Sequence, residues 1–94
     1  MASKSLIMYR TIIANLGCVI CREYLGEITE PQLHHIAQGS GRRSEFMICP
    51  LCPEHHTGAG GFHSSPRSFL RLYKLPTEFH LLALVNKFRA EDKI

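Results

Sequence analysis

Two Cys-x-x-Cys pairs are the feature that most constrains how this chain can fold. Cys18 and Cys21 form the first pair, and Cys49 and Cys52 form the second, within a chain of 94 residues. A domain of this size buries little apolar surface and is often stabilised by a metal ion or by disulfides. Each short turn presents two thiolates to one ion, so the two pairs predict a tetrahedral zinc site. The alternative is that the four cysteines are small buried apolar side chains.

The rest of the chain favours zinc over disulfides. No apolar stretch approaches the length of a membrane span, because Arg10 interrupts the first one, and the opening "MASKSL" lacks the apolar run of a signal peptide. We therefore expect a cytoplasmic protein with no membrane association. Cysteines stay reduced in that compartment, where they more often bind a metal than pair with each other.

The spacing leaves the identity of the fourth zinc ligand open. Cys52 also begins "CPEH", so Cys52 and His55 form a Cys-x-x-His pair at the start of an expected helix. Zinc can therefore be bound by Cys18, Cys21 and Cys52 together with either Cys49 or His55.

A β-hairpin is expected in the middle of the chain, after an N-terminal helix. Residues 4–17 show helical spacing of apolar side chains and end at a glycine, whereas residues 22–32 are polar and typical of a loop. Residues 33–37 and 45–51 are short apolar runs bounded by turn residues, as strands are. The glycine-rich segment 39–44 joins them into a hairpin.

Three helices are expected after the hairpin. A short one begins at Pro53, a second spans 66–74 with Ser65 as its N-cap, and a third is capped by Thr77. The third helix carries an apolar stripe suited to core packing, formed by Leu81, Leu84, Val85 and Phe88. The polar tail 90–94 is expected to fray. These elements predict a single α+β domain over residues 1–94.

The positive charge is concentrated in one segment. The net charge is +3, and the whole excess lies in residues 39–76. The charged residues of that segment are Arg42, Arg43, Arg67, Arg71 and Lys74, against Glu45 and Glu54. Such a local basic patch suits a polyanion such as DNA, and the alternative is an ordinary solvated surface.

Two adjacent histidines, His34 and His35, lie on the first expected strand. Side chains alternate along a strand, so the two imidazoles face opposite sides, and one can bind a metal while the other addresses a water molecule. Imidazole suits proton transfer because its pKa lies near neutrality. The alternative is that both histidines are structural.

Several motifs in this order resemble the HNH, or ββα-metal (His-Me finger), nucleases. More narrowly, they are similar to the phage recombination-enhancement (Ref) group of RecA-dependent nucleases. The similarity covers most of residues 17–75. Its motifs are "GCVIC" at 17–21, "LHHIA" at 33–37, "CPLCPEHH" at 49–56, "GGFHSS" at 60–65 and "SFLRLY" at 68–73.

The resemblance implies a zinc-stapled ββα-metal fold with flanking helices. It also implies a phage or prophage endonuclease that hydrolyses DNA in the bacterial host cytoplasm, leaving 5′-phosphate and 3′-hydroxyl ends. The expected cofactors are a structural Zn²⁺ and one catalytic divalent ion, Mg²⁺, Mn²⁺ or Zn²⁺. The expected partners are DNA and a RecA filament, and we expect a monomer or a weak dimer.

The resemblance also implies a role for each residue that matches the family's motifs. Its zinc-containing members place a catalytic metal ligand directly after the second residue of the zinc knuckle. That pattern gives a Cys3His zinc site in which Cys49 is not a ligand. It also makes His35 the general base. The zinc ligands are then Cys18, Cys21, Cys52 and His55, and the catalytic ion is held by His34, His56 and His63. The candidate phosphate contacts are Arg42, Arg43, Arg67 and Arg71.

The chain departs from the family pattern at one position. The family often has an asparagine in the second strand that orients the general base, and "EFMIC" contains none. Glu45 is the only nearby polar candidate for that role, unless a backbone carbonyl serves. The main alternative function is a zinc-ribbon-like adaptor that binds DNA or protein without catalysis.

Overall fold

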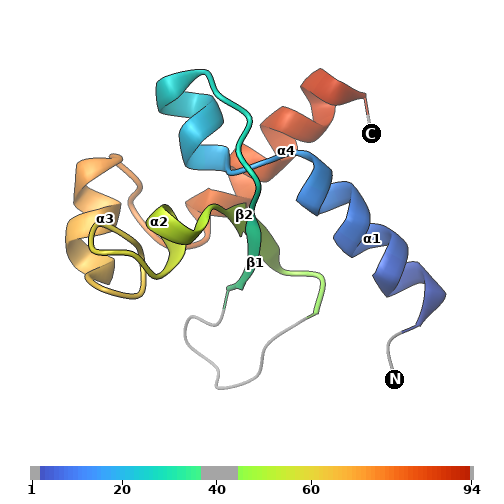
Figure 1. Cartoon of the computed structure of the whole chain (residues 1–94), viewed down its shortest axis with the longest axis horizontal. Coiled ribbons are helices and arrows are strands. Elements are labelled where there is room, and N and C mark those ends of the chain that lie inside the picture. Colours follow the sequence, from blue (N-terminus) through green and yellow to red (C-terminus); the bar gives the residue numbers. More distant parts are fainter. Residues whose placement is uncertain (1–2, 37–44, 94) are drawn as a thin grey trace.

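Helices surround a two-stranded hairpin in the computed structural model, which describes residues 3–36 and 45–93 (Figure 1). The elements are α1 (Lys4–Asn15), the π-helix η1 (Cys21–Leu25), β1 (Gln32–His35), β2 (Ile48–Leu51), α2 (Pro53–His56), α3 (Pro66–Leu72) and α4 (His80–Asp92). This confirms the predicted α+β arrangement of a hairpin with flanking helices.

Helix α1 begins at Lys4, as its sequence predicts, and ends at Asn15, slightly before the predicted end at Gly17. The Ser3 hydroxyl accepts a hydrogen bond from the Leu6 N–H at 3.1 Å and caps the first turn. Leu6 and Ile13 face the core. Gly17 follows the helix with φ +78°, and a Cβ there would lie 2.9 Å from Cγ2 of Ile28. Glycine therefore lets the chain turn tightly into Cys18.

The segment after Cys18 corrects one prediction. Residues 22–32 were expected to be irregular, but η1 covers Cys21–Leu25 and ends at Gly26, which is left-handed. Arg22 stabilises this helix through tertiary contacts, because it donates to both carboxylate oxygens of Asp92 at 2.9 and 3.0 Å. Its guanidinium also lies 4.3 Å from the centre of the Phe88 ring. Local sequence alone does not reveal such contacts.

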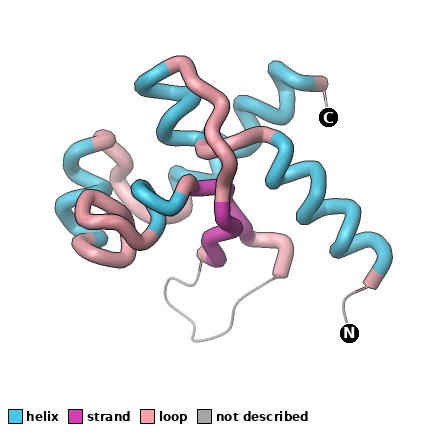
Figure 2. The backbone as a smooth tube through the Cα atoms, viewed as in Figure 1, coloured by secondary structure: helices cyan, strands magenta, loops and turns pink. Residues whose placement is uncertain are grey.

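The hairpin is antiparallel and lies at the centre of the fold (Figure 2). Its register pairs His34 with Cys49 and His35 with Ile48. Both strands are shorter than their apolar runs predicted, and the predicted connection at 39–44 lies outside the described residues. All four residues of β2 are buried, and α1, α2 and α4 contact the hairpin.

Helices α2 and α3 begin at Pro53 and Pro66, as predicted, although the Ser65 side chain forms no capping hydrogen bond. Helix α4 begins at His80, so the prediction that Thr77 caps it is wrong. Thr77 instead donates its N–H to Nδ1 of His80 at 3.2 Å, in a turn that precedes the helix.

The predicted apolar stripe of α4 packs into the core. Leu81, Val85 and Phe88 are buried, and Leu84 is half-buried. The helix continues to Asp92, so the predicted fraying of the polar tail is wrong over that stretch, where the Arg22 contact holds the last turn. Within the described residues, no helix has the length and apolarity needed to cross a membrane.

Candidate metal centres

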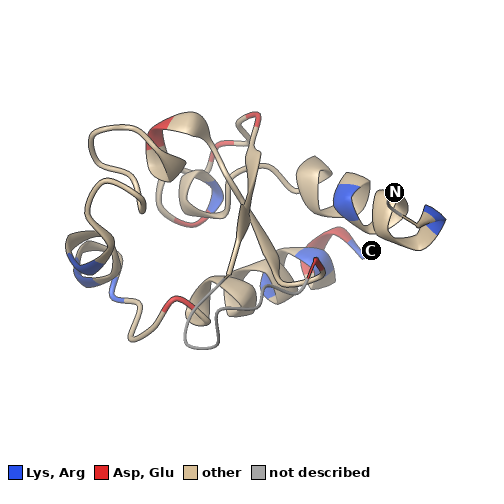
Figure 3. Cartoon of the chain, turned by 90° about the horizontal axis from the view of Figure 1, so that it is seen from below, with Lys and Arg blue, Asp and Glu red and all other residues tan. Residues whose placement is uncertain are grey.

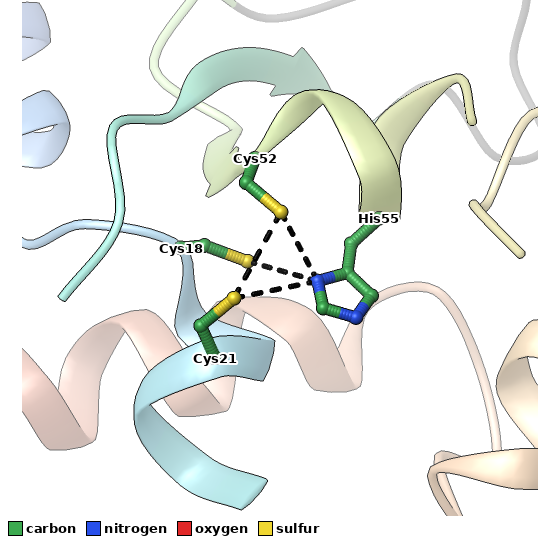
Figure 4. A group of neighbouring side chains, drawn as sticks. All are labelled: Cys18, Cys21, Cys52 and His55. Atoms are coloured by element: carbon green, nitrogen blue, oxygen red, sulfur yellow. Dashed lines mark hydrogen bonds between the residues drawn. The ribbon is translucent and has the colours of Figure 1, made fainter. Parts of the chain in front are cut away.

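Three cysteines and one histidine from separate segments converge on one point (Figure 4). Cys18 precedes η1, Cys21 opens it, Cys52 precedes α2, and His55 lies on α2. The Sγ atoms of Cys21 and Cys52 are 3.8 Å apart. Nδ1 of His55 lies 3.6 Å from Sγ of Cys18, 3.5 Å from that of Cys21 and 3.2 Å from that of Cys52.

These separations fit the ligands of a single zinc ion. Zinc binds thiolate sulfur at about 2.3 Å and imidazole nitrogen at about 2.0–2.1 Å, usually in a tetrahedron. Simple geometry then places two sulfurs about 3.8 Å apart and a sulfur about 3.6 Å from a nitrogen. The observed distances lie at or slightly below those values. The donor set and its spacing therefore fit Zn²⁺.

Burial favours the protonated thiol at two of the three cysteines, Cys18 and Cys21. It raises the pKa of Cys18 to about 12 and also raises the pKa of Cys21, because desolvation penalises the thiolate. A thiolate is the form that binds zinc. Zinc binding at this group must therefore release protons, and its affinity falls with decreasing pH.

Cys49 lies outside this group. Its side chain is fully buried on β2, opposite His34, and burial raises its pKa well above the usual range. The structure thus brings together the Cys3His set that the resemblance implied, and Cys49 packs in the core instead.

A second group consists of His34, His56 and His63. One ring nitrogen from each lies within 4.8 Å of those of the other two. The Nε2 atoms of His56 and His63 are 3.1 Å apart. Two nitrogens bound to one ion at about 2.1 Å lie roughly 3.0–3.4 Å apart, so this pair also has the spacing of shared ligands.

The loop after α2 returns His63 to His56. The His63 N–H donates to the His56 carbonyl at 2.9 Å, and the Phe62 N–H donates to the His55 carbonyl at 2.8 Å. Gly61 makes this return tight, because a Cβ at that position would lie 2.8 Å from the Glu54 carbonyl oxygen. Gly61 therefore helps to bring His63 to the three-histidine group.

Two histidines of this group, His34 and His56, have pKa values below the ordinary value of histidine. The pKa of His34 is lowered to about 4, mainly by burial and to a lesser extent by the nearby His63 and His35. Burial, with the neighbouring His34 and His63, also lowers the pKa of His56. A neutral imidazole keeps the lone pair that binds a metal.

Two residues that the sequence did not single out contact these histidines. Nε2 of His34 lies 2.7 Å from Oε2 of Glu78, and both side chains are buried. Nδ1 of His56 donates to Oε1 of Gln32 at 2.9 Å. Gln32 is two residues before His34 on the same strand face, which is a usable signal. Glu78 lies 44 positions from His34 and offers no local signal.

His35 lies outside both groups, beside Glu45. Its Nε2 is 3.5 Å from Oε2 of Glu45, and that same oxygen accepts a hydrogen bond from Nη2 of Arg10 at 2.6 Å. Arg10, and to a lesser extent His35, lower the pKa of the Glu45 carboxyl. Glu45 therefore lies, ionised, where the sequence suggested a partner for His35.

The candidate DNA contacts are divided between two segments. Arg67 and Arg71 are exposed on α3, the helix that follows the loop carrying His63. Figure 3 colours the basic positions of the chain blue along the ribbon. Arg42 and Arg43 lie outside the described residues.

The comparisons with known proteins give one match. Residues 6–83 match the family model described as "Recombination enhancement, RecA-dependent nuclease". No curated protein and no solved structure matched the chain. The matched region contains all residues of both metal-ligand groups together with Gln32, Glu45 and Glu78. The chain therefore belongs to the recombination-enhancement, RecA-dependent nuclease family.

Proposed function

We propose that this protein is a metal-dependent DNA endonuclease that hydrolyses phosphodiester bonds, with RecA filaments as the setting for its activity. The observation that carries this proposal is the convergence of three imidazoles, two of them with lowered pKa values, beside a Cys3His group. The family supplies the nuclease class and the connection to RecA.

The Cys3His group supports the site by fixing α2. His55 and His56 are adjacent on this single helical turn, so zinc bound at His55 orients the residue that carries the second metal ligand. A four-residue helix has little stability of its own, because helix nucleation is costly. We therefore assign the structural Zn²⁺ to Cys18, Cys21, Cys52 and His55.

His34, His56 and His63 would hold the catalytic ion, which when bound supplies positive charge to the phosphate and to the departing 3′ oxygen. Imidazole ligands suit zinc and other transition metals, whereas Mg²⁺ prefers oxygen ligands. We accordingly expect this group to bind Zn²⁺ more tightly than Mn²⁺, and Mn²⁺ more tightly than Mg²⁺.

His35 is the proposed general base. Its Nε2 faces Glu45, which leaves Nδ1 to accept the proton of the attacking water. The 3.5 Å separation is long for a hydrogen bond, and orienting contacts are often long before the substrate binds. Arg10 holds the Glu45 carboxylate in place, so the pair takes the role that the family often gives to an asparagine.

The substrate would approach over α3. Its exposed Arg67 and Arg71 lie close in sequence to His63 and are suited to phosphate contacts. Contacts of this kind are independent of base sequence and supply much of the affinity of nucleic-acid-binding proteins.

A plasmid-nicking assay tests this function. The full chain, loaded with one zinc, is assayed with Mg²⁺, Mn²⁺ or Zn²⁺, with and without RecA filaments. His35→Ala should lower the nicking rate by about 10²–10⁴-fold, which is the usual worth of general-base catalysis. His80→Ala, at an exposed histidine outside both groups, should leave it unchanged.

Two outcomes would contradict the proposal. Equal activity of the wild type and His35→Ala would remove His35 from the mechanism. DNA binding without nicking, under every metal and with RecA filaments present, would favour a zinc-ribbon-like adaptor.

A further inference from the structure

We propose that Glu78 is a positioning residue that holds His34 with its proton on Nε2, so that His34 presents Nδ1 to the divalent ion. The inference rests on the proposed metal centre and adds a residue to it from outside the hairpin and α2. Glu78 lies in the segment between α3 and α4.

The contact between Glu78 and His34 defines which nitrogen carries the proton. Oε2 of Glu78 lies 2.7 Å from Nε2 of His34, and the two side chains are only 10% and 2% exposed. With Glu78 as a carboxylate, which can only accept hydrogen bonds, and His34 as a neutral imidazole, which carries one N–H, we assign the proton of His34 to Nε2 and its lone pair to Nδ1.

The other nitrogen of His34 needs a partner. Among the described residues, Nδ1 of His34 is buried and has no hydrogen-bond partner. A buried polar atom in this state costs free energy, because it has lost water without replacement. An ion held with His56 and His63 would satisfy it, since the three histidines already form one group.

His56 shows the same arrangement with its nitrogens exchanged. Its Nδ1 donates to Oε1 of Gln32 at 2.9 Å, which leaves the lone pair on Nε2, 3.1 Å from Nε2 of His63. In two of the three imidazoles, one nitrogen thus donates to an acceptor, and the other has a lone pair that can bind a metal ion. Metal-binding histidines usually show this pattern, in which the acceptor fixes the tautomer and ring orientation.

The fold places the Glu78 carboxylate firmly. The Glu78 carbonyl accepts the Leu81 N–H at 3.0 Å, and Leu81 is completely buried in the core. Helix α4 packs against β2, which pairs with the strand that carries His34. The charge of Glu78 also raises the pKa of Cys49, which helps to keep that thiol protonated.

The test measures metal affinity and the tautomer of His34 in the full chain with zinc at the Cys3His group. Mn²⁺ alone is titrated into the wild type, Glu78→Ala, Glu78→Gln and the control Glu30→Gln, which changes an exposed carboxylate. Glu78→Ala should weaken Mn²⁺ binding by about 10–100-fold, the usual effect of losing such a partner. Glu78→Gln should weaken Mn²⁺ binding less than Glu78→Ala does, because an amide oxygen still accepts the Nε2–H.

Histidine ¹⁵N NMR before Mn²⁺ is added gives a readout that does not depend on activity. His34 should carry its proton on Nε2 in the wild type and in Glu78→Gln, and should become a mixture of tautomers in Glu78→Ala. A proton on Nδ1 in the wild type would overturn the proposal even if Glu78→Ala fails to fold. Unchanged Mn²⁺ affinity in a folded Glu78→Ala would overturn it as well.

His34→Ala separates this inference from the function on which it rests. If His34→Ala abolishes Mn²⁺ binding while Glu78→Ala leaves it unchanged, the metal centre stands and the role of Glu78 is wrong. If His34→Ala also binds Mn²⁺ normally, the metal centre itself is wrong.

Discussion

At the scale of single residues, the two metal groups differ in how readily the sequence predicts them. The candidate zinc ligands lie in short motifs whose spacing is itself the signal, and the structure brings Cys18, Cys21, Cys52 and His55 together. The choice between Cys49 and His55 could not be made from spacing. It depends on the strand direction, since the register sets Cys49 opposite His34 and inside the core.

The role of Cys49 gives a direct prediction at this scale. Cys49→Ala should retain close to one equivalent of zinc per chain and lose about 1 kcal/mol of unfolding free energy, as an average core substitution does. Cys52→Ala should lose the zinc, because it removes a ligand from a four-coordinate site. Zinc is measured on protein dialysed against a weak chelator. Loss of zinc from Cys49→Ala would contradict the Cys3His assignment.

The contacts around the histidines mark the limit of sequence-based prediction. Glu45 could be named from the sequence because it follows the expected hairpin loop, and it does lie beside His35. Glu78 could not be named, because only the packing of α4 against the hairpin brings it to His34. Residues that act through another residue carry no spacing signal of their own.

At the scale of elements, most helices and both strands follow from local signals. Pro53 and Pro66 start helices where the preference of proline for the first turn predicts. The π-helix η1 was missed because it depends on distant contacts of Arg22 with Asp92 and Phe88. The same contacts explain why α4 continues to Asp92.

The return loop after α2 supplies a prediction with a matched control. Gly61→Ala places a Cβ 2.8 Å from the Glu54 carbonyl oxygen, so the loop must shift away from α2. We expect about 1–3 kcal/mol of destabilisation, as for overpacking, and weaker Mn²⁺ binding because His63 moves. Gly60→Ala meets nothing within 4 Å and should change neither quantity. Calorimetry and Mn²⁺ titration measure both, and identical behaviour of the two variants would contradict this account of the loop.

The contact of Arg22 with Asp92 predicts a pH dependence. Arg22 lowers the pKa of Asp92 below its ordinary 3.8, so the folded state favours the carboxylate. The contact therefore stabilises the fold above that ordinary value, and its contribution is lost as the pH falls through the folded-state pKa. Asp92→Asn should have a lower free energy of unfolding than the wild type at neutral pH. This difference should disappear in acid.

Chemical denaturation at a series of pH values measures this difference. Glu27→Gln, at an exposed glutamate, serves as the control and should follow the wild type throughout. If the difference in unfolding free energy between Asp92→Asn and the wild type stays the same below the folded-state pKa, the charge of Asp92 is not its cause.

At the scale of the whole molecule, the two candidate metal-binding groups share structural elements. The Cys3His group joins η1 to α2, and the next residue of α2 enters the three-histidine group that β1 and the return loop complete. The hydrophobic core forms around the same hairpin, with buried residues from α1, α3 and α4. Zinc, core and candidate active site therefore depend on the same few elements.

The exposed arginines of α3 give a prediction about DNA binding. Arg67→Ala with Arg71→Ala should weaken DNA binding and make log K less steep against log salt by about one unit for each lost phosphate contact. Lys4→Ala, at the start of α1, should have little effect. Fluorescence anisotropy over a salt series gives both quantities. A slope unchanged by the α3 double substitution would place the DNA elsewhere.

The most direct test of the central claim is anomalous diffraction at the zinc edge from crystals of the full chain soaked in Zn²⁺. We expect two separate ions. One is bound by Cys18, Cys21, Cys52 and His55, and the other by Nδ1 of His34 with Nε2 of His56 and of His63. A single peak at the cysteines, with the three histidines bare at saturating Zn²⁺, would contradict the proposed metal centre.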